Sequence, residues 1–204
     1  MADLLIELFS EEIPSDLQAP AAENFKKLMT NGMVEAGLTY ATTSAFYTAR
    51  RLTLVVEDLL EASPTVQEVR KGPKVGAPEP AISGFLRGVG LSMDDLEVRD
   101  DKKGQVYFAK ITKPGRPAPE IVAEVLEATI RNFPWPKSMR WGSGSLRWVR
   151  PLQSILCILS SEAEVSVVPL EVDGLKAGNQ TQGHRFMAPD AFAVNGFEDY
   201  ETKL

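Results

Sequence analysis

The chain has 204 residues, of which 44% are hydrophobic and 25% charged, and its formal net charge is −6. These totals are typical of a soluble globular protein, long enough for one large domain or for one domain and part of a second. A single cysteine and a single histidine exclude an intrachain disulfide and a cysteine-based metal cluster, and no apolar run approaches the roughly 20 residues of a membrane helix. The acidic N-terminus lacks the basic region of a secretory signal, which predicts a cytoplasmic location.

The first quarter of the chain predicts a buried strand, a helix and a hairpin in succession. Residues 4–9 are almost entirely apolar, as in a central strand that is covered on both faces. A helix follows, with apolar residues at helical spacing as far as Gly37. The next strand covers 43–47, and it is expected to form a hairpin or bulged pair with its successor, with Arg50 and Arg51 at the turn.

The remainder of the chain is a mixture of loops, strands and two helices. Residues 63–80 are rich in Pro, Gly and Lys, which predicts a long surface loop rather than a domain linker. Residues 81–92 predict a short helix interrupted by glycines. The later elements are a strand over 105–111, an amphipathic helix over 120–132, and strands over 152–159 and 164–172, the last interrupted at Pro169. Strands mixed with a few helices predict an α+β fold with mainly antiparallel sheets.

One short segment, residues 135–151, contains every tryptophan of the chain. It also carries four cations and no acidic residue, although the chain as a whole is acidic. Either the segment is a packed core feature with charged edges, or it faces an anionic, flat partner. Arginine makes bidentate contacts with phosphate, and tryptophan offers a stacking surface for a base. The negative net charge argues against indiscriminate nucleic-acid binding but leaves a local basic face open.

Other basic residues also lie at predicted strand ends and in loops beside Gly or Pro. Such positions leave side chains available for ligands, because the core does not need them. The alternative is that the tryptophans are core residues and that the arginines pair with the excess carboxylates. The candidate residues for binding an anionic partner or forming an interface are Arg50, Arg51, Arg70, Lys71, Lys137, Arg140, Arg147, Arg150, His184 and Arg185.

The sequence carries little sign of catalytic machinery of its own. It has no Walker-type phosphate loop, and GSGS at 142–145 lacks the strand–nucleophile–helix context of a nucleophile elbow. Glu11 and Glu12 are neighbours at a strand end, where adjacent side chains point to opposite faces. One of them is expected to cap the following helix, since a helix N-terminus favours negative charge. We therefore assign no catalytic residue and no metal ligand.

Seven short motifs follow one another along the chain. They are FSEEIP (9–14), ARRLTL (49–54), RKGP (70–73), AxxGFLRGxGLS (81–92), PWPKSMRWG (134–142), RWVRP (147–151) and GHRF (183–186). In this order they resemble the N-terminal region of the bacterial glycyl-tRNA synthetase beta subunit family. The chain departs from the family pattern at 9–10, at Ala49 and at Trp148, where the family more often has Gly-Thr, Pro and Phe. Because an aromatic of either kind occurs at 148, we expect Trp148, like Trp141, to pack beneath the loop.

The resemblance implies the N-terminal part of a beta subunit in an alpha-two beta-two ligase that charges tRNA with glycine. ATP and magnesium are then used by the alpha subunit, with no cofactor in this chain, and the beta subunit supplies tRNA recognition. The implied partners are the alpha subunit, the tRNA for glycine and the rest of the beta subunit, with no membrane. Residues 1–190 are expected to form an α+β domain similar to the editing-type domain of the phenylalanyl-tRNA synthetase beta subunit, and 191–204 the truncated start of the following region.

Two other functions stay open. One is an editing-like hydrolase of mischarged tRNA, with Glu11, Glu12 or His184 in its site. Glycine is the smallest amino acid, so steric exclusion of larger ones lowers the need for editing. The other is a purely structural domain at a subunit interface, because buried networks of arginine and carboxylate also fix arginines in place.

Overall fold

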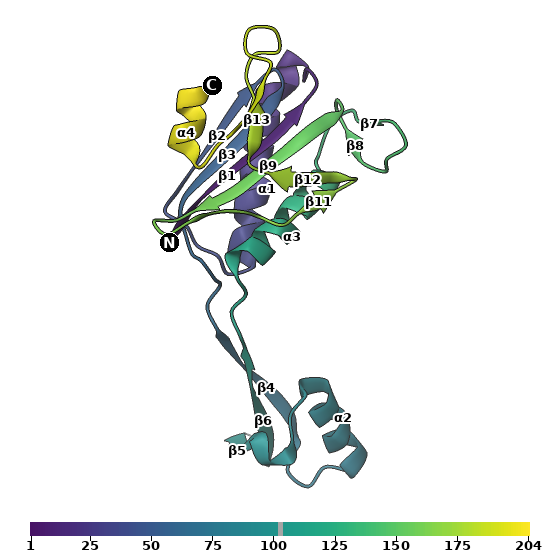
Figure 1. Ribbon diagram of the computed structural model, residues 1–204. Coiled ribbons are helices and arrows are strands. Elements are labelled where there is room, and N and C mark those ends of the chain that lie inside the picture. Colours follow the sequence, from purple (N-terminus) through teal and green to yellow (C-terminus); the bar gives the residue numbers. More distant parts are fainter. Residues whose placement is uncertain (102–103) are drawn as a thin grey trace. The chain divides into compact units, whose positions relative to one another are not determined.

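The computed structural model describes residues 1–101 and 104–204, which divide into two units (Figure 1). The larger unit comprises residues 1–63 and 116–204, and the smaller one comprises residues 64–115. The predicted α+β class, with mainly antiparallel sheets and a few packed helices, is confirmed. In the described ranges no helix has both the length and the apolar character that a bilayer span requires.

A sheet that has seven strands among the described residues forms the centre of the larger unit. Its order is β11, β12, β9, β1, β3, β2, and β10 also pairs with β9. Neighbouring strands are antiparallel except β12 and β9, which are parallel. The strands are β1 (Ala2–Ser10), β2 (Thr42–Thr48), β3 (Arg51–Leu59), β9 (Leu152–Ser160), β10 (Val165–Val167), β11 (Glu171–Val172) and β12 (Leu175–Gly178).

Strand β1 lies between β3 and β9 and is covered on both faces, as its apolar sequence predicted. Leu4, Ile6 and Leu8 belong to the core that α1 (Ser15–Glu35) and α3 (Ala118–Arg131) share with the sheet. Leu5 belongs to a smaller core on the opposite face. Alternate residues of a strand point to opposite faces, so a strand between two cores needs apolar residues at both parities.

Two further predictions about this sheet are confirmed. Strands β2 and β3 form the expected hairpin, in which Ala49 and Arg50 make the turn and Arg51 begins β3. The stretch over 164–172 is broken around Pro169 into β10 and β11. Proline has no N–H to donate to a sheet ladder, and the interruption follows from this.

The opposite face of the sheet is covered by the C-terminal elements β13 (Gln180–Gln182), β14 (Ala191–Ala193) and α4 (Phe197–Lys203). Val194 and Tyr200 are buried there with Leu5 and Val55. Residues 191–204 thus contribute to the core of the larger unit in this chain. The domain boundary after residue 190 stays a prediction.

The smaller unit contains an antiparallel sheet in the order β4–β6–β5, with one α-helix between β4 and β5. Its elements are β4 (Val66–Lys74), α2 (Glu79–Val89), the 3-10 turn η1 (Met93–Asp95), β5 (Leu96–Asp101) and β6 (Gly104–Lys113). The prediction of a surface loop over 63–80 was wrong, because 66–74 pairs with β6. The prediction of an interrupted helix was also wrong: α2 continues through Gly84 and Gly88 to Val89. Gly90 caps its end, and the left-handed φ of 69° at this position favours glycine.

Gly32 of α1 allows the close packing of this helix against α3. A Cβ added at Gly32 would lie 2.6 Å from Cγ1 of Val125. We expect Gly32→Ala to destabilise the larger unit by about 1–2 kcal/mol, because the overpacking outweighs the better helix propensity of alanine. Urea unfolding followed by tryptophan fluorescence measures this, since all three tryptophans lie in the larger unit.

The double variant Gly32→Ala/Val125→Ala is the control for this prediction. With the valine methyls removed, the added Cβ has room, and only the gain in helix propensity remains. The double variant should therefore be more stable than Val125→Ala alone. If Gly32→Ala is equally destabilising in both backgrounds, the contact with Val125 is not the cause.

Candidate nucleic-acid interface

The segment 135–151 contains a short antiparallel ribbon of β7 (Met139–Arg140) and β8 (Arg147–Trp148). The pairing places Arg140 directly opposite Arg147, and both side chains are exposed. Like charges at opposed strand positions repel each other. A bound anion between them would relieve this repulsion. We call the ribbon and its four cations, Lys137, Arg140, Arg147 and Arg150, the basic ribbon.

The cations of the basic ribbon have no carboxylate partner in residues 1–101 and 104–204. The Arg147 guanidinium donates to the carbonyl of Ser138 at 3.2 Å, and that of Arg150 donates to the carbonyl of Val149 at 3.1 Å. A carbonyl orients a guanidinium without neutralising it, so the positive charges stay available. Lys137 and Arg150 also line one cavity of about 390 Å³ beside the start of α1.

The three tryptophans pack between the basic ribbon and the core of the larger unit. Trp148 is 1% exposed and packs against Phe133 and Trp135, with all three ring centroids within 5.0 Å of one another. The indole N–H of Trp141 donates to the carbonyl of Trp148 at 3.1 Å, which ties the two strands together. The expectation that Trp141 and Trp148 pack beneath the loop is confirmed. The buried Trp148 therefore anchors the strand that carries Arg147 and does not offer a stacking surface, whereas Trp135 and Trp141 are partly buried.

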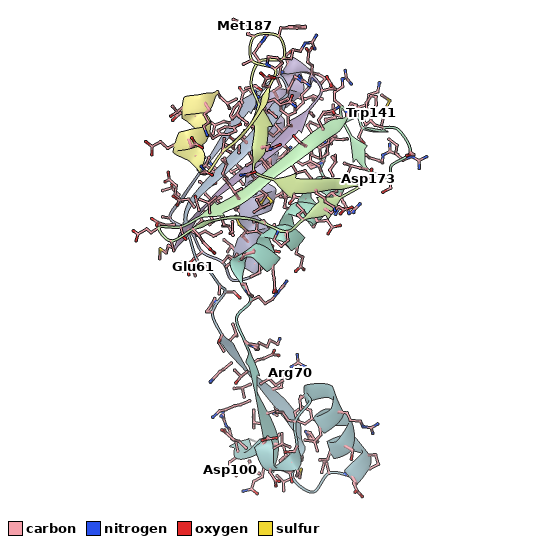
Figure 2. All side chains as sticks on the ribbon, viewed as in Figure 1. Glu61, Arg70, Asp100, Trp141, Asp173 and Met187 are labelled. Atoms are coloured by element: carbon pink, nitrogen blue, oxygen red, sulfur yellow. The ribbon has the colours of Figure 1, made fainter. Side chains whose placement is uncertain are left out.

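Asp173, which the sequence did not single out, holds the GSGS turn between the two strands. Its carboxylate accepts from the N–H of Ser145 at 2.8 Å, from the Ser145 hydroxyl at 2.9 Å and from the N–H of Leu146 at 3.2 Å. These hydrogen bonds, the one from the Ser145 N–H foremost, hold the pKa of Asp173 below its usual value. A Cβ at Gly144 would lie 2.0 Å from the Asp173 carboxylate, so this turn needs glycine. Figure 2 labels Trp141 and Asp173 on this side of the larger unit.

Four other predicted residues gather around a second cavity, of about 520 Å³, in the larger unit. They are Arg50, Arg51, His184 and Arg185. Unlike the cations of the basic ribbon, each of these arginines pairs with a glutamate. The ion pairs are Arg50–Glu11 at 3.3 Å, Arg51–Glu7 at 3.0 Å and Arg185–Glu12 at 3.2 Å.

Glu7 is the second residue that sequence reasoning missed. It is fully buried on β1, and its carboxylate accepts hydrogen bonds from Arg51, from the Thr181 hydroxyl at 2.6 Å and from the Tyr200 hydroxyl at 2.5 Å. Because the Tyr200 hydroxyl donates to Glu7, it accepts in turn from the Thr53 hydroxyl at 3.0 Å. Burial, and then the Glu7 charge, raise the pKa of Tyr200. The signal in the sequence was a single acid inside the apolar run of β1.

The remaining two candidates, Arg70 and Lys71, lie on β4 of the smaller unit. Arg70 pairs with Glu68 at 2.7 Å, and Lys113 pairs with the same carboxylate at 2.7 Å. Hydrogen bonds from Lys113 and then Arg70 lower the pKa of Glu68 to about 2. Arg70 is therefore engaged in a cross-strand ion-pair cluster of its own unit.

The structure also shows the surroundings of the two glutamates that the hydrolytic alternative would use, Glu11 and Glu12. Glu11 and Glu12 pair with arginines, and neither caps α1, which has no side-chain cap at Pro14. The prediction of a glutamate cap was wrong because these carboxylates meet arginines from later strands and loops. Glu12 and His184 line the same cavity. Hydrolysis stays a prediction, which deacylation of alanyl- or seryl-charged glycine tRNA by this chain would test.

Comparison with known proteins shows which class of protein this chain belongs to. Residues 4–204 match the family described as glycyl-tRNA synthetase beta subunit. The chain is 71% identical over 204 residues to the glycine–tRNA ligase beta subunit of Ruegeria sp. (strain TM1040), covering 100% of this chain and 30% of the relative. Against the subunits of the same name from Cereibacter sphaeroides (strain ATCC 17023) and Paracoccus denitrificans (strain Pd 1222) the identities are 70% and 68%, with the whole chain covered and 29% and 30% of the relatives.

These matches extend over both units, and the class of protein that they define is the aminoacyl-tRNA synthetase subunits. The chain belongs to the glycyl-tRNA synthetase beta subunit family. It spans about 30% of the length of the relatives that it matches. The family resemblance found from the seven motifs is thereby confirmed.

Proposed function

We propose that this chain contacts tRNA through the basic ribbon and so supports the charging of tRNA with glycine. The observation that carries the proposal is the uncompensated positive charge of the ribbon. In the described part of the chain, its four cations have no carboxylate partner, and Arg140 lies opposite Arg147. Unpaired arginines at the surface suit phosphate oxygens, which they bind in bidentate fashion. Such contacts position an RNA without reading its sequence.

The wider setting is part of the same proposal. ATP and magnesium act in an alpha subunit, this chain supplies no catalytic group, and the rest of the beta subunit completes the tRNA contact. The assembly is an alpha-two beta-two ligase in the cytoplasm. The larger unit is then comparable to the editing-type domain of the phenylalanyl-tRNA synthetase beta subunit, used here for binding.

The test is the salt dependence of tRNA affinity in the complete ligase. Each lost phosphate contact reduces the slope of log K against log salt by about 0.7 to 0.9, so Arg140→Ala/Arg147→Ala should reduce it by about 1.4 to 1.8. A matched control is Arg116→Ala/Lys203→Ala, which removes two positive charges that are engaged with Glu124 and Asp199. The control should leave the slope unchanged.

The control also separates this proposal from the purely structural alternative. Equal slopes for both double variants would rule out direct phosphate contact by the ribbon. If Arg140→Ala/Arg147→Ala instead prevents the subunits from assembling, as measured by sedimentation velocity, the ribbon is a subunit interface. Retained assembly with a reduced slope supports the tRNA contact.

A further inference from the structure

Three of the sequence motifs meet at the second cavity of the larger unit. Phe9 comes from the end of β1, Arg50 from the β2–β3 turn and Arg51 from the start of β3. His184 and Arg185 come from the loop between β13 and β14. Figure 1 shows this loop projecting at the end of the sheet where β1 ends. More than a hundred positions separate the third motif from the first two. This open cavity has a volume of about 520 Å³, which is enough for a small ligand.

The wall of the cavity contains arginine N–H donors whose guanidinium groups are held in place by contacts with neighbouring residues. Each arginine pairs with a glutamate, and Arg50 also donates through Nε to the carbonyl of Ser10 at 3.1 Å. The guanidinium groups of Arg50 and Arg51 lie 4.7 and 5.0 Å from the ring centroid of Phe9. A guanidinium carries five N–H donors, and these contacts use only some of them. The remaining donors are held in fixed positions at the cavity.

His184 adds a further donor. Its Nδ1 accepts from the backbone N–H groups of Phe186 and Met187, both at 3.3 Å. In a neutral imidazole one nitrogen accepts and the other carries the proton. The hydrogen bonds at Nδ1 therefore assign the proton to Nε2, which can donate to a ligand. The side chain is exposed, so this donor is accessible.

The loop that carries His184 also presents an aromatic ring to water. Phe186 is 75% exposed, and the Arg185 guanidinium lies 4.6 Å from the centroid of its ring. The base of the loop is closed by the hydrogen bond from the Ala188 N–H to the His184 carbonyl at 2.8 Å. A Cβ at Gly183 would lie 2.7 Å from Cβ of Ala188, so glycine permits this closure. The ring is thus presented on a closed turn, with Met187 at its tip (Figure 2).

The geometry points to a binding site for one unpaired nucleotide, separate from the basic ribbon. The base stacks on the exposed ring of Phe186, and the phosphate oxygens accept from Arg185 and from Nε2 of His184. An exposed ring alone would equally suit a protein partner. The adjoining cluster of fixed N–H donors favours a ligand that combines a flat ring with an oxyanion. The inference rests on the proposed function in taking that ligand to be RNA.

The probe is a fluorescently labelled single strand of six adenosines, titrated into the full chain at low salt and followed by anisotropy. Loss of a base-stacking ring is worth about 5- to 150-fold in affinity, so Phe186→Ala should weaken binding by a factor in that range. Met187→Ala is the matched control: this neighbouring side chain is 85% exposed, apolar and on the same turn, and its removal should change the affinity less than twofold. Arg185→Ala removes a donor to the phosphate oxygens and should also weaken binding.

The outcomes distinguish this site from the basic ribbon. If Phe186→Ala and Met187→Ala leave the affinity equally unchanged, the nucleotide site is overturned, and the tip is left as a surface for protein contact. If Arg140→Ala/Arg147→Ala abolishes binding of the hexanucleotide while Phe186→Ala leaves the affinity unchanged, the cavity is again excluded, although the proposed function stands. Weakening by Phe186→Ala, with the tRNA salt slope unaffected by Arg140→Ala/Arg147→Ala, would support the cavity and contradict the ribbon.

Discussion

Replacing Glu7 with alanine is expected to lower the free energy of unfolding of the larger unit by about 3–5 kcal/mol. The Glu7 carboxylate is fully buried, and its partner Arg51 has a side chain only 12% exposed. Removing one member of a buried ion pair leaves the other charge uncompensated in a poorly solvated place. Domains have only about 5–15 kcal/mol of stability, so this loss is a large fraction of the total. Urea unfolding followed by tryptophan fluorescence measures it.

The reason for so large an effect is that Glu7 connects four elements. Through Arg51 it is linked to β3, through Thr181 to β13 and through Tyr200 to α4. Arg51 also donates to the carbonyls of Gln182 and Gly183, where the loop of the second cavity begins. Loss of the carboxylate therefore removes hydrogen-bond acceptors from three buried or half-buried donors at once. Unsatisfied buried donors each cost about 1–3 kcal/mol.

Two milder variants make this prediction specific. Tyr200→Phe removes the hydrogen bond to the Glu7 carboxylate and the weaker one with Thr53, and should cost about 1.5–3 kcal/mol. Glu7→Gln keeps the shape and an acceptor oxygen but removes the charge, so it should fall between Tyr200→Phe and Glu7→Ala. An unfolding free energy of Glu7→Ala within 1 kcal/mol of the unchanged chain would mean that water reaches Arg51 and that the network is not important for stability.

The sequence predicted those helices and strands whose formation depends on the local residue pattern, and it failed where a strand forms only by pairing with a distant one. The apolar run of β1 and the helical spacing of α1 predict these elements directly, because burial on two faces or on one stripe requires those patterns. Strand β4 could not be predicted in the same way. Its sequence VQEVRKGPK is polar and contains Gly and Pro, and it is a strand because β6, some 40 positions later, pairs with it.

The same distinction between local and long-range contacts applies to the candidate site. The sequence predicted the basic ribbon as a group of cations and aromatics, because both lie within 17 consecutive positions, 135–151. Which arginines are neutralised could not be predicted, since Arg51 meets Glu7 across 44 positions and Arg185 meets Glu12 across 173. The role of Asp173 was hidden for the same reason: its partners lie 27 and 28 positions earlier.

Trp148 is the residue at which stability and the proposed tRNA contact meet, and its truncation should affect both. Trp148→Ala removes the largest fully buried side chain and the aromatic contacts with Phe133 and Trp135. The expected cost is about 3–5 kcal/mol, the usual range for deleting a buried aromatic. Without this packing β8 is no longer held in place, and Arg147 loses its position. The affinity of Trp148→Ala for tRNA should therefore be lowered, as that of Arg140→Ala/Arg147→Ala is. Urea unfolding followed by far-UV circular dichroism and a tRNA titration measure the two effects.

Trp148→Phe separates the anchoring role from any role of the indole itself. Among the described residues, the Trp148 indole N–H has no hydrogen-bond acceptor although it is buried. An unsatisfied buried donor is unfavourable, so its removal offsets part of the volume lost, and Trp148→Phe should cost only about 1–2 kcal/mol. Trp141→Phe, which gives up a satisfied bond to the Trp148 carbonyl, has no such compensation. If Trp148→Phe keeps the tRNA affinity, the ring serves the ribbon as an anchor; a loss as large as that of Trp148→Ala would show that the indole contacts RNA.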